Sequence, residues 1–301
     1  MQNTLKQKII IPAWEIIQEH STLKKFYFLP GLLSIIFLSV LLVYQAIYTY
    51  VEVFGYKEEA FQVILGFFHS SYAFEAIVGG IIFFLVYIVI APLFEGAMIK
   101  YIESVNNEKD TSVGDALGMG IYRFLPLFEY NNIFSEFKLI SILNAYLFMI
   151  RFLGIEYISY LSGVFVFVFI FSVVLNILFS YSKYFIVVEN KKVFPAISAS
   201  SKLAILNISI TSRIYFLMFL LNMRVVFNFL IFLSFPLLMV VAVSLITSKI
   251  YLAIAIIFLS VVFSILILAL GYLTAVLEIF KTALWYFAYK HGKQKTQNLE
   301  E

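Results

Sequence analysis

Six long runs of apolar residues dominate this chain of 301 residues, and they decide its class of fold. Several runs reach the roughly 20 residues that an α-helix needs to cross a bilayer. Charged residues make up 13% of the chain, whereas a soluble domain carries about 25%. A transmembrane barrel would show alternating strands of about ten residues, which this sequence lacks. The sequence therefore predicts an all-α integral membrane protein.

We predict about six transmembrane helices. Their approximate ranges are 26–50, 74–101, 137–155, 158–187, 225–246 and 251–278. The loop between the third and fourth predicted helices is very short, as is the loop between the fifth and sixth. Such short loops favour antiparallel hairpins. The chain would then consist of three hairpins in a single transmembrane domain, 26–290. An interfacial N-terminal segment, 1–25, precedes this domain, and a polar tail, 291–301, follows it.

The distribution of lysine and arginine predicts the orientation of the helices. If the N-terminus is cytoplasmic, 18 of the 21 basic residues fall on the cytoplasmic side. The other three are Lys57, Arg151 and Lys249. Positively charged loops stay on the cytoplasmic side of a membrane, so both termini are expected there.

Two amphipathic segments lie in the predicted cytoplasmic loops, at 112–128 and 193–208. Each follows a turn rich in charged residues, and their apolar positions align with an offset of 80 residues, so that Gly120 corresponds to Ser200. Ser112 and Asp115 have the spacing of a helix-capping box. We expect two surface helices that brace the hairpins, related either by duplication or only by a shared role.

Three runs in and around these helices carry a resemblance to a known family: PLFEGAMIKYI, TSVGDALGMGIYRFLPLF and YFIVVENKKVFPAISASSKLAILN. They resemble bacterial multi-pass proteins grouped with the membrane domain of glycerophosphoryl diester phosphodiesterases. The resemblance implies a fold of spans linked by amphipathic helices. The sequence contains no soluble phosphodiesterase domain, so it does not imply that catalytic activity.

Polar residues inside the predicted spans are the candidate site residues, because such residues are costly in lipid. Glu95 and Glu278 lie near the inner ends of their spans, close in sequence to Lys100 and Lys281. They are either interfacial carboxylates paired with lysine or groups that couple protons or ions. Deeper in the spans lie Asn144, Asn176 and Asn228, which either join helices or line a path. Small residues at Gly79 and Gly80 predict a close approach of helices.

Signatures of catalysis and metal binding are missing from the sequence. It has no cysteine, no phosphate-binding glycine loop, and three histidines that the predicted topology separates. We expect no catalytic residue, no cofactor and no metal.

Three functions remain open at this stage. The first is a non-enzymatic scaffold, assembly or lipid-organising protein of a bacterial cytoplasmic membrane. The second is a transporter for a small or lipid-like solute, and the third is a membrane-embedded lipid enzyme. The expected partners are the lipid bilayer and a protein at the cytoplasmic face, with no nucleic acid.

Overall fold

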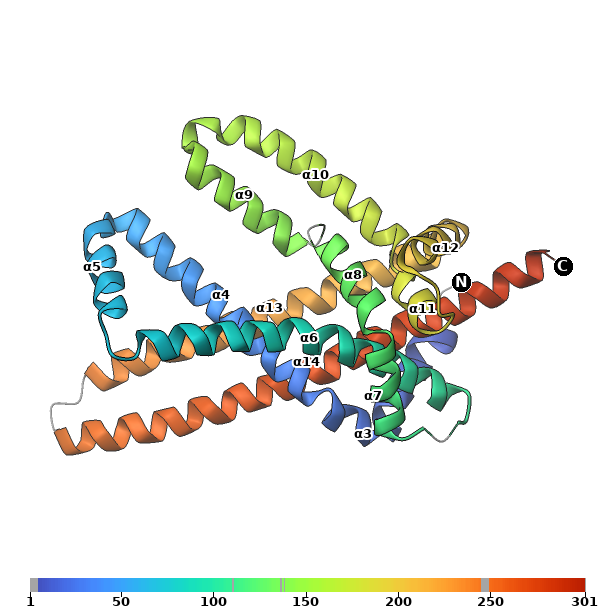
Figure 1. Cartoon of the computed structure of the whole chain (residues 1–301), viewed down its shortest axis with the longest axis horizontal. Coiled ribbons are helices and arrows are strands. Elements are labelled where there is room, and N and C mark those ends of the chain that lie inside the picture. Colours follow the sequence, from blue (N-terminus) through green and yellow to red (C-terminus); the bar gives the residue numbers. More distant parts are fainter. Residues whose placement is uncertain (1–4, 110, 136, 138, 245–248, 301) are drawn as a thin grey trace. The chain divides into compact units, whose positions relative to one another are not determined.

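Every regular element in the described part of the chain is a helix (Figure 1). The computed structural model describes residues 5–109, 111–135, 137, 139–244 and 249–300. The parts of predicted segments at 1–4, 138, 245–246 and 301 lie outside these residues. The elements in chain order are η1 (Lys6–Ile10), α2 (Ile11–Glu19), α3 (Ser21–Phe26), α4 (Phe28–Phe54), α5 (Lys57–Phe68), α6 (Ala73–Asn106), α7 (Val113–Tyr122), α8 (Phe124–Ser135), α9 (Leu139–Leu153), η2 (Ile155–Tyr157), α10 (Ile158–Leu178), α11 (Ser182–Val187), α12 (Val193–Leu206), α13 (Ile208–Ser244) and α14 (Lys249–Glu300). The prediction of an all-α protein is confirmed.

Four helical segments of the described part are long and apolar enough to cross a membrane. They are Ser21–Leu41, Ala73–Asn106, Ile158–Val187 and Ala253–Gln297. A fifth is added if α12 and the first part of α13, which meet at a bend of 102°, count as one span. The predicted third span corresponds to α9, whose 15 residues measure about 22 Å, less than the roughly 30 Å of hydrocarbon. Six spans therefore stay a prediction.

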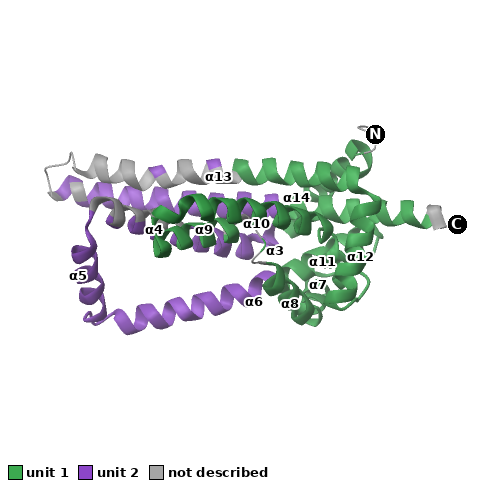
Figure 2. Ribbon diagram, turned by 90° about the horizontal axis from the view of Figure 1, so that it is seen from above, with its two compact units in different colours: residues 1–23, 92–224, 279–301 green, residues 24–91, 225–278 purple. Residues whose placement is uncertain are grey.

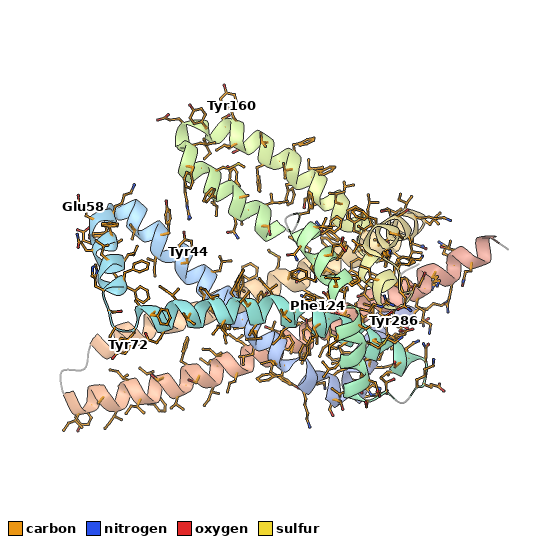
Figure 3. The ribbon with its side chains drawn as sticks, in the orientation of Figure 1. Tyr44, Glu58, Tyr72, Phe124, Tyr160 and Tyr286 are labelled. Carbon is orange, nitrogen blue, oxygen red and sulfur yellow. The ribbon has the colours of Figure 1, made fainter. Side chains whose placement is uncertain are left out.

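The surfaces of these helices are suited to lipid. Only 6% of the most apolar 18-residue stretch of α6 is buried, and the corresponding stretch of Ala253–Gln297 is 0% buried. Tyr160, beside the turn between α9 and α10, is 79% exposed (Figure 3). Tyrosine is enriched where a bilayer meets water. Long apolar helices whose side chains are mostly not buried within the protein, with exposed aromatic rings near their ends, are typical of a multi-pass membrane protein.

The chain divides into two compact units (Figure 2). Unit 1 comprises Met1–Leu23, Pro92–Arg224 and Ile279–Glu301. Unit 2 comprises Lys24–Ala91 and Val225–Glu278. Four of the described helices, α3, α6, α13 and α14, contribute residues to both units. In α6 the change of unit falls at Pro92, the proline inside that helix.

In unit 2, α4 and α14 approach closely through small residues. A Cβ built on Gly31 would lie 2.8 Å from the carbonyl oxygen of Gly271. Ile35 is buried beside this contact, packed against Phe263 and Leu270 among others. The predicted contact at Gly79 and Gly80 is wrong, because a Cβ there would meet no described atom within 4 Å. Small residues do allow close helix packing, but the pair that does so here is Gly31 and Gly271.

In unit 1, α9 and α10 form the predicted antiparallel hairpin (Figure 1). Across it, the hydroxyls of Tyr146 and Ser162 are hydrogen-bonded at 2.7 Å, and the rings of Tyr146 and Phe165 lie 4.5 Å apart. A left-handed glycine, Gly154, with φ of 96°, permits the turn between the two helices.

The first predicted surface helix, 112–128, is two helices, α7 and α8, separated at Arg123. Its start is as expected, because Ser112 and Asp115 form the capping box, and hydrogen bonds from Ser112 lower the pKa of the Asp115 carboxyl. The break changes the apolar face. Ala116 and Gly120 are buried, whereas Ile121 and Leu125, predicted for the same face, are 63% and 68% exposed.

The second predicted surface helix corresponds to α12, which buries Val193, Ala196, Ser200, Leu203 and Ala204. The turn before α7 and the turn before α12 each contain a residue in the left-handed region, Glu108 and Asn190. Both α11 and α12 pack against α8. The two surface segments are thus held together within unit 1.

Candidate functional site

Glu95 lies at the centre of the first polar cluster of unit 1. It follows Pro92 in α6 by three residues, and its carboxylate forms an ion pair with Lys183 of α11. The side-chain amide of Asn131, in α8, donates a hydrogen bond of 3.2 Å to Oε2 of Glu95. The Lys183 ammonium also lies 5.8 Å from the ring centroid of Tyr130. Three helices that are distant in sequence therefore meet at one carboxylate.

This pairing differs from the expected one. The sequence placed Glu95 beside Lys100, but Lys100 bonds instead to Glu103, at 2.8 Å. Residues five apart point about 140° away from each other on a helix of 3.6 residues per turn, whereas residues three apart are neighbours. The partner of Glu95 comes from 88 positions further along the chain.

The Glu95–Lys183 pair is partly shielded from water, since its side chains are 21% and 26% exposed. Exposed ion pairs contribute about 0–1 kcal/mol, and breaking a buried pair costs about 3–5 kcal/mol. This pair falls between the two cases. Its carboxylate oxygens accept bonds from an ammonium and an amide, so the arrangement is suited to joining helices.

A second cluster surrounds Glu189, in the turn after α11. Its carboxylate accepts bonds from Lys191 at 3.0 Å, from Lys293 at 2.8 Å and from the hydroxyl of Tyr289 at 2.5 Å. Partial burial alone would raise the pKa of Glu189, but the hydrogen bonds from Lys293, Tyr289 and Lys191 outweigh it and lower that pKa. The carboxylate is thus held in its charged form and joins the turn to α14.

Sequence reasoning missed the Glu189 cluster. Tyr289 and Lys293 are four residues apart on α14, so both lie on one face of that helix. This spacing could have indicated a shared helix face. The predicted polar tail begins at residue 291, however, and so separates Lys293 from Tyr289, whereas α14 continues through both. The partner, Glu189, lies in the charged turn that precedes the second predicted surface helix. Nothing local connects the two segments, which are 100 residues apart.

Buried tyrosines provide a third set of polar contacts in unit 1. The Tyr181 hydroxyl is hydrogen-bonded to that of Thr211 at 2.8 Å, and its backbone N–H donates to Ser200 Oγ at 3.0 Å. The Tyr184 hydroxyl donates to the Thr282 carbonyl at 2.9 Å. A buried tyrosine hydroxyl usually finds such a partner, so these contacts are those of a packed core.

The remaining predicted site residues are placed as follows. Asn176, in α10, donates a hydrogen bond of 2.7 Å to the carbonyl of Phe137, which lies just before α9, and one of 2.8 Å to the carbonyl of Ser172 in its own helix. Asn144 is half-buried in α9. Glu278 is half-buried in the part of α14 that belongs to unit 2. Asn228 lies in α13, and its side chain is outside the described ones.

No family model, curated protein or solved structure matches this chain. The resemblance drawn from its sequence therefore stays a prediction, and any chemistry has to be argued from geometry. Among the described residues, no three His, Cys, Asp or Glu side chains lie together as a group that could hold a metal ion. The carboxylates of Glu95, Glu103 and Glu189 in unit 1 are engaged by lysine, amide or phenol groups.

Proposed function

We propose that this chain is a non-enzymatic scaffold or lipid-organising protein of a bacterial cytoplasmic membrane, with unit 1 as its rigid platform. The observation that supports the proposal most is that carboxylates of unit 1 form ion pairs between its helices. Glu95 and Glu189 each join helices that are far apart in sequence, through Lys183 and Lys293 respectively. Groups committed to such contacts stabilise an arrangement of helices.

The surface helices support the same proposal. Ala116 and Gly120 of α7 are buried, while Ile121, Tyr122 and Leu125 are more than 60% exposed. Arg123 lies beside these exposed residues, with its guanidinium 4.5 Å from the centroid of the Tyr122 ring. Apolar and aromatic side chains next to a basic residue suit the interface of a membrane. We assign this face to the inner leaflet of the bilayer.

The topology belongs to the proposal as well: six spans in three hairpins, with both termini in the cytoplasm. Since the chain contains no cysteine, single-cysteine variants can report the side of the membrane without background. In intact cells, a membrane-impermeant maleimide should label Lys57→Cys and should label Lys109→Cys only after lysis. The reverse labelling would overturn the orientation.

The function itself is tested in liposomes that contain only this protein. A scaffold should leave the solute permeability of the liposomes at the level of empty ones, and cross-linking in native membranes should recover the same protein partner repeatedly. Solute flux that rises in proportion to the amount of protein would favour a transporter and refute the scaffold.

A further inference from the structure

A small polar pocket in unit 1 lies beside the Glu189 cluster and shares Tyr289 and Lys293 with it. It has a volume of about 220 Å³ and lies between the end of α6, the residue after α11, and the last turns of α14. Pockets for drug-sized ligands measure about 300–1,000 Å³. This one is therefore sized for a small group, such as an ion or a headgroup.

The floor of the pocket is aromatic and its rim is polar. Tyr286, labelled in Figure 3, and Tyr289 line it and are each only 3% exposed. The side-chain amides of Asn107, Gln294 and Gln297 lie at the exposed rim. A ligand seated here would meet flat apolar rings on one side and N–H donors on the other.

The charges around the pocket leave a surplus of cations. Glu103 also lines it, but its carboxylate is paired with Lys100 at 2.8 Å. Lys293 is paired with Glu189, which is also bonded to Lys191. Lys290 lines the same pocket, and no ion pair joins it to any described residue. When the lining residues are counted with their ion-pair partners, four lysines thus stand against two glutamates, and Lys290 is the lysine without a carboxylate.

We propose that this pocket binds an anionic phosphate group, as a phosphate monoester or diester. Lysine binds phosphate as a point charge, and here Lys290 and Lys293 would supply two ammonium groups on one side of α14. The amides at the rim would donate hydrogen bonds to the remaining oxygens. The phosphate comes from a lipid headgroup or from a soluble ester, and the test separates these sources. The proposal rests on the lining of the pocket, which lies wholly within unit 1, and it does not depend on the scaffold function.

The test uses the full chain purified in detergent, with glycerol phosphate and short-chain phosphatidylglycerol as the probes. Binding is measured by calorimetry. Lys290→Gln should weaken binding about tenfold, the loss expected for one charged contact of about 1.4 kcal/mol. Lys295→Gln is the matched control: the same change on the same helix, at an exposed lysine that does not line the pocket.

The outcomes distinguish the two sources of phosphate from each other, and they also test whether the site exists. Equal binding of both probes assigns a soluble phosphate ester, whereas binding of the lipid alone assigns a headgroup. If Lys290→Gln fails to fold, Gln294→Glu places a negative charge at the exposed rim and should weaken binding at least as much. Binding of neither probe, or equal loss in the Lys295→Gln control, would overturn the site. Liposome flux tests the scaffold separately.

Discussion

Two glycines of α7 offer a sharp test of how the first surface segment is held. A Cβ built on Gly120 would overlap the carbonyl oxygen of Leu93 and lie 3.0 Å from Cβ of Ala97, both in α6. A Cβ on Gly118, two positions earlier, would meet no described atom within 4 Å. The same substitution at these two positions therefore probes contact with α6 and little else.

The expected sizes follow from two opposing effects. Replacing a helical glycine by alanine stabilises the helix by about 0.5–1 kcal/mol, and Gly118→Ala should show this gain. Gly120→Ala gains the same amount but forces α7 away from α6, and overpacking of this kind costs about 1–3 kcal/mol. The two variants should differ by that cost, roughly 5- to 140-fold in the unfolding equilibrium.

The measurement is unfolding of the full chain in mild detergent, followed by circular dichroism during titration with a denaturing detergent. Wild type, Gly118→Ala and Gly120→Ala are compared at equal concentrations. The predicted order of stability places Gly118→Ala first and Gly120→Ala last. If Gly120→Ala is as stable as Gly118→Ala, α7 does not rest on α6 as described.

Three further predictions concern the polar contacts of unit 1. Glu95→Gln and Lys183→Met should each destabilise the protein, with a coupling free energy of about 1–3 kcal/mol in a double-mutant cycle; strictly additive effects would contradict the ion pair. Because the pKa of Glu189 is lowered in the folded protein, its contribution is present above the ordinary carboxyl pKa and is lost as the pH falls through the lowered one. Unfolding measured from neutral pH to about pH 3 should therefore show a flatter pH dependence for Glu189→Gln than for the wild type. Tyr181→Phe should cost about 0.5–1.5 kcal/mol, because the Thr211 hydroxyl keeps its bond to the Asn207 carbonyl but loses the one to Tyr181, whereas a loss below about 0.5 kcal/mol would show that water replaces the bond.

Local features of the fold could be read from the sequence. The all-α class follows from the length of the apolar runs, and the start of α7 follows from Ser112 and Asp115, three residues apart. The hairpin of α9 and α10 follows from the short loop between them. Each of these depends on residues within a few turns of one another, where spacing decides geometry.

Contacts between distant segments could not be read in this way. Lys100 is the nearest lysine in sequence to Glu95, yet the ion pair described for Glu95 joins it to Lys183. Gly79 and Gly80 suggested a helix contact, but the close approach in unit 2 uses Gly31 and Gly271. A sequence shows that a small or charged residue is present, whereas its partner depends on which faces the packed helices present.

The corresponding positions of the two surface helices differ in their chemistry. Gly120 and Ser200 correspond through the offset of 80 residues. Gly120 lies where α7 meets α6, and Ser200 lies where α12 meets the end of α10. Gly120 allows backbone contact with Leu93, since it has no side chain. Ser200 instead fills the space with a hydroxyl that donates to the Leu178 carbonyl at 2.8 Å and accepts from the Tyr181 N–H. The two corresponding positions thus make their helix contacts by different means, one through a missing side chain and the other through a hydroxyl group, so residue identity does not reveal the shared position.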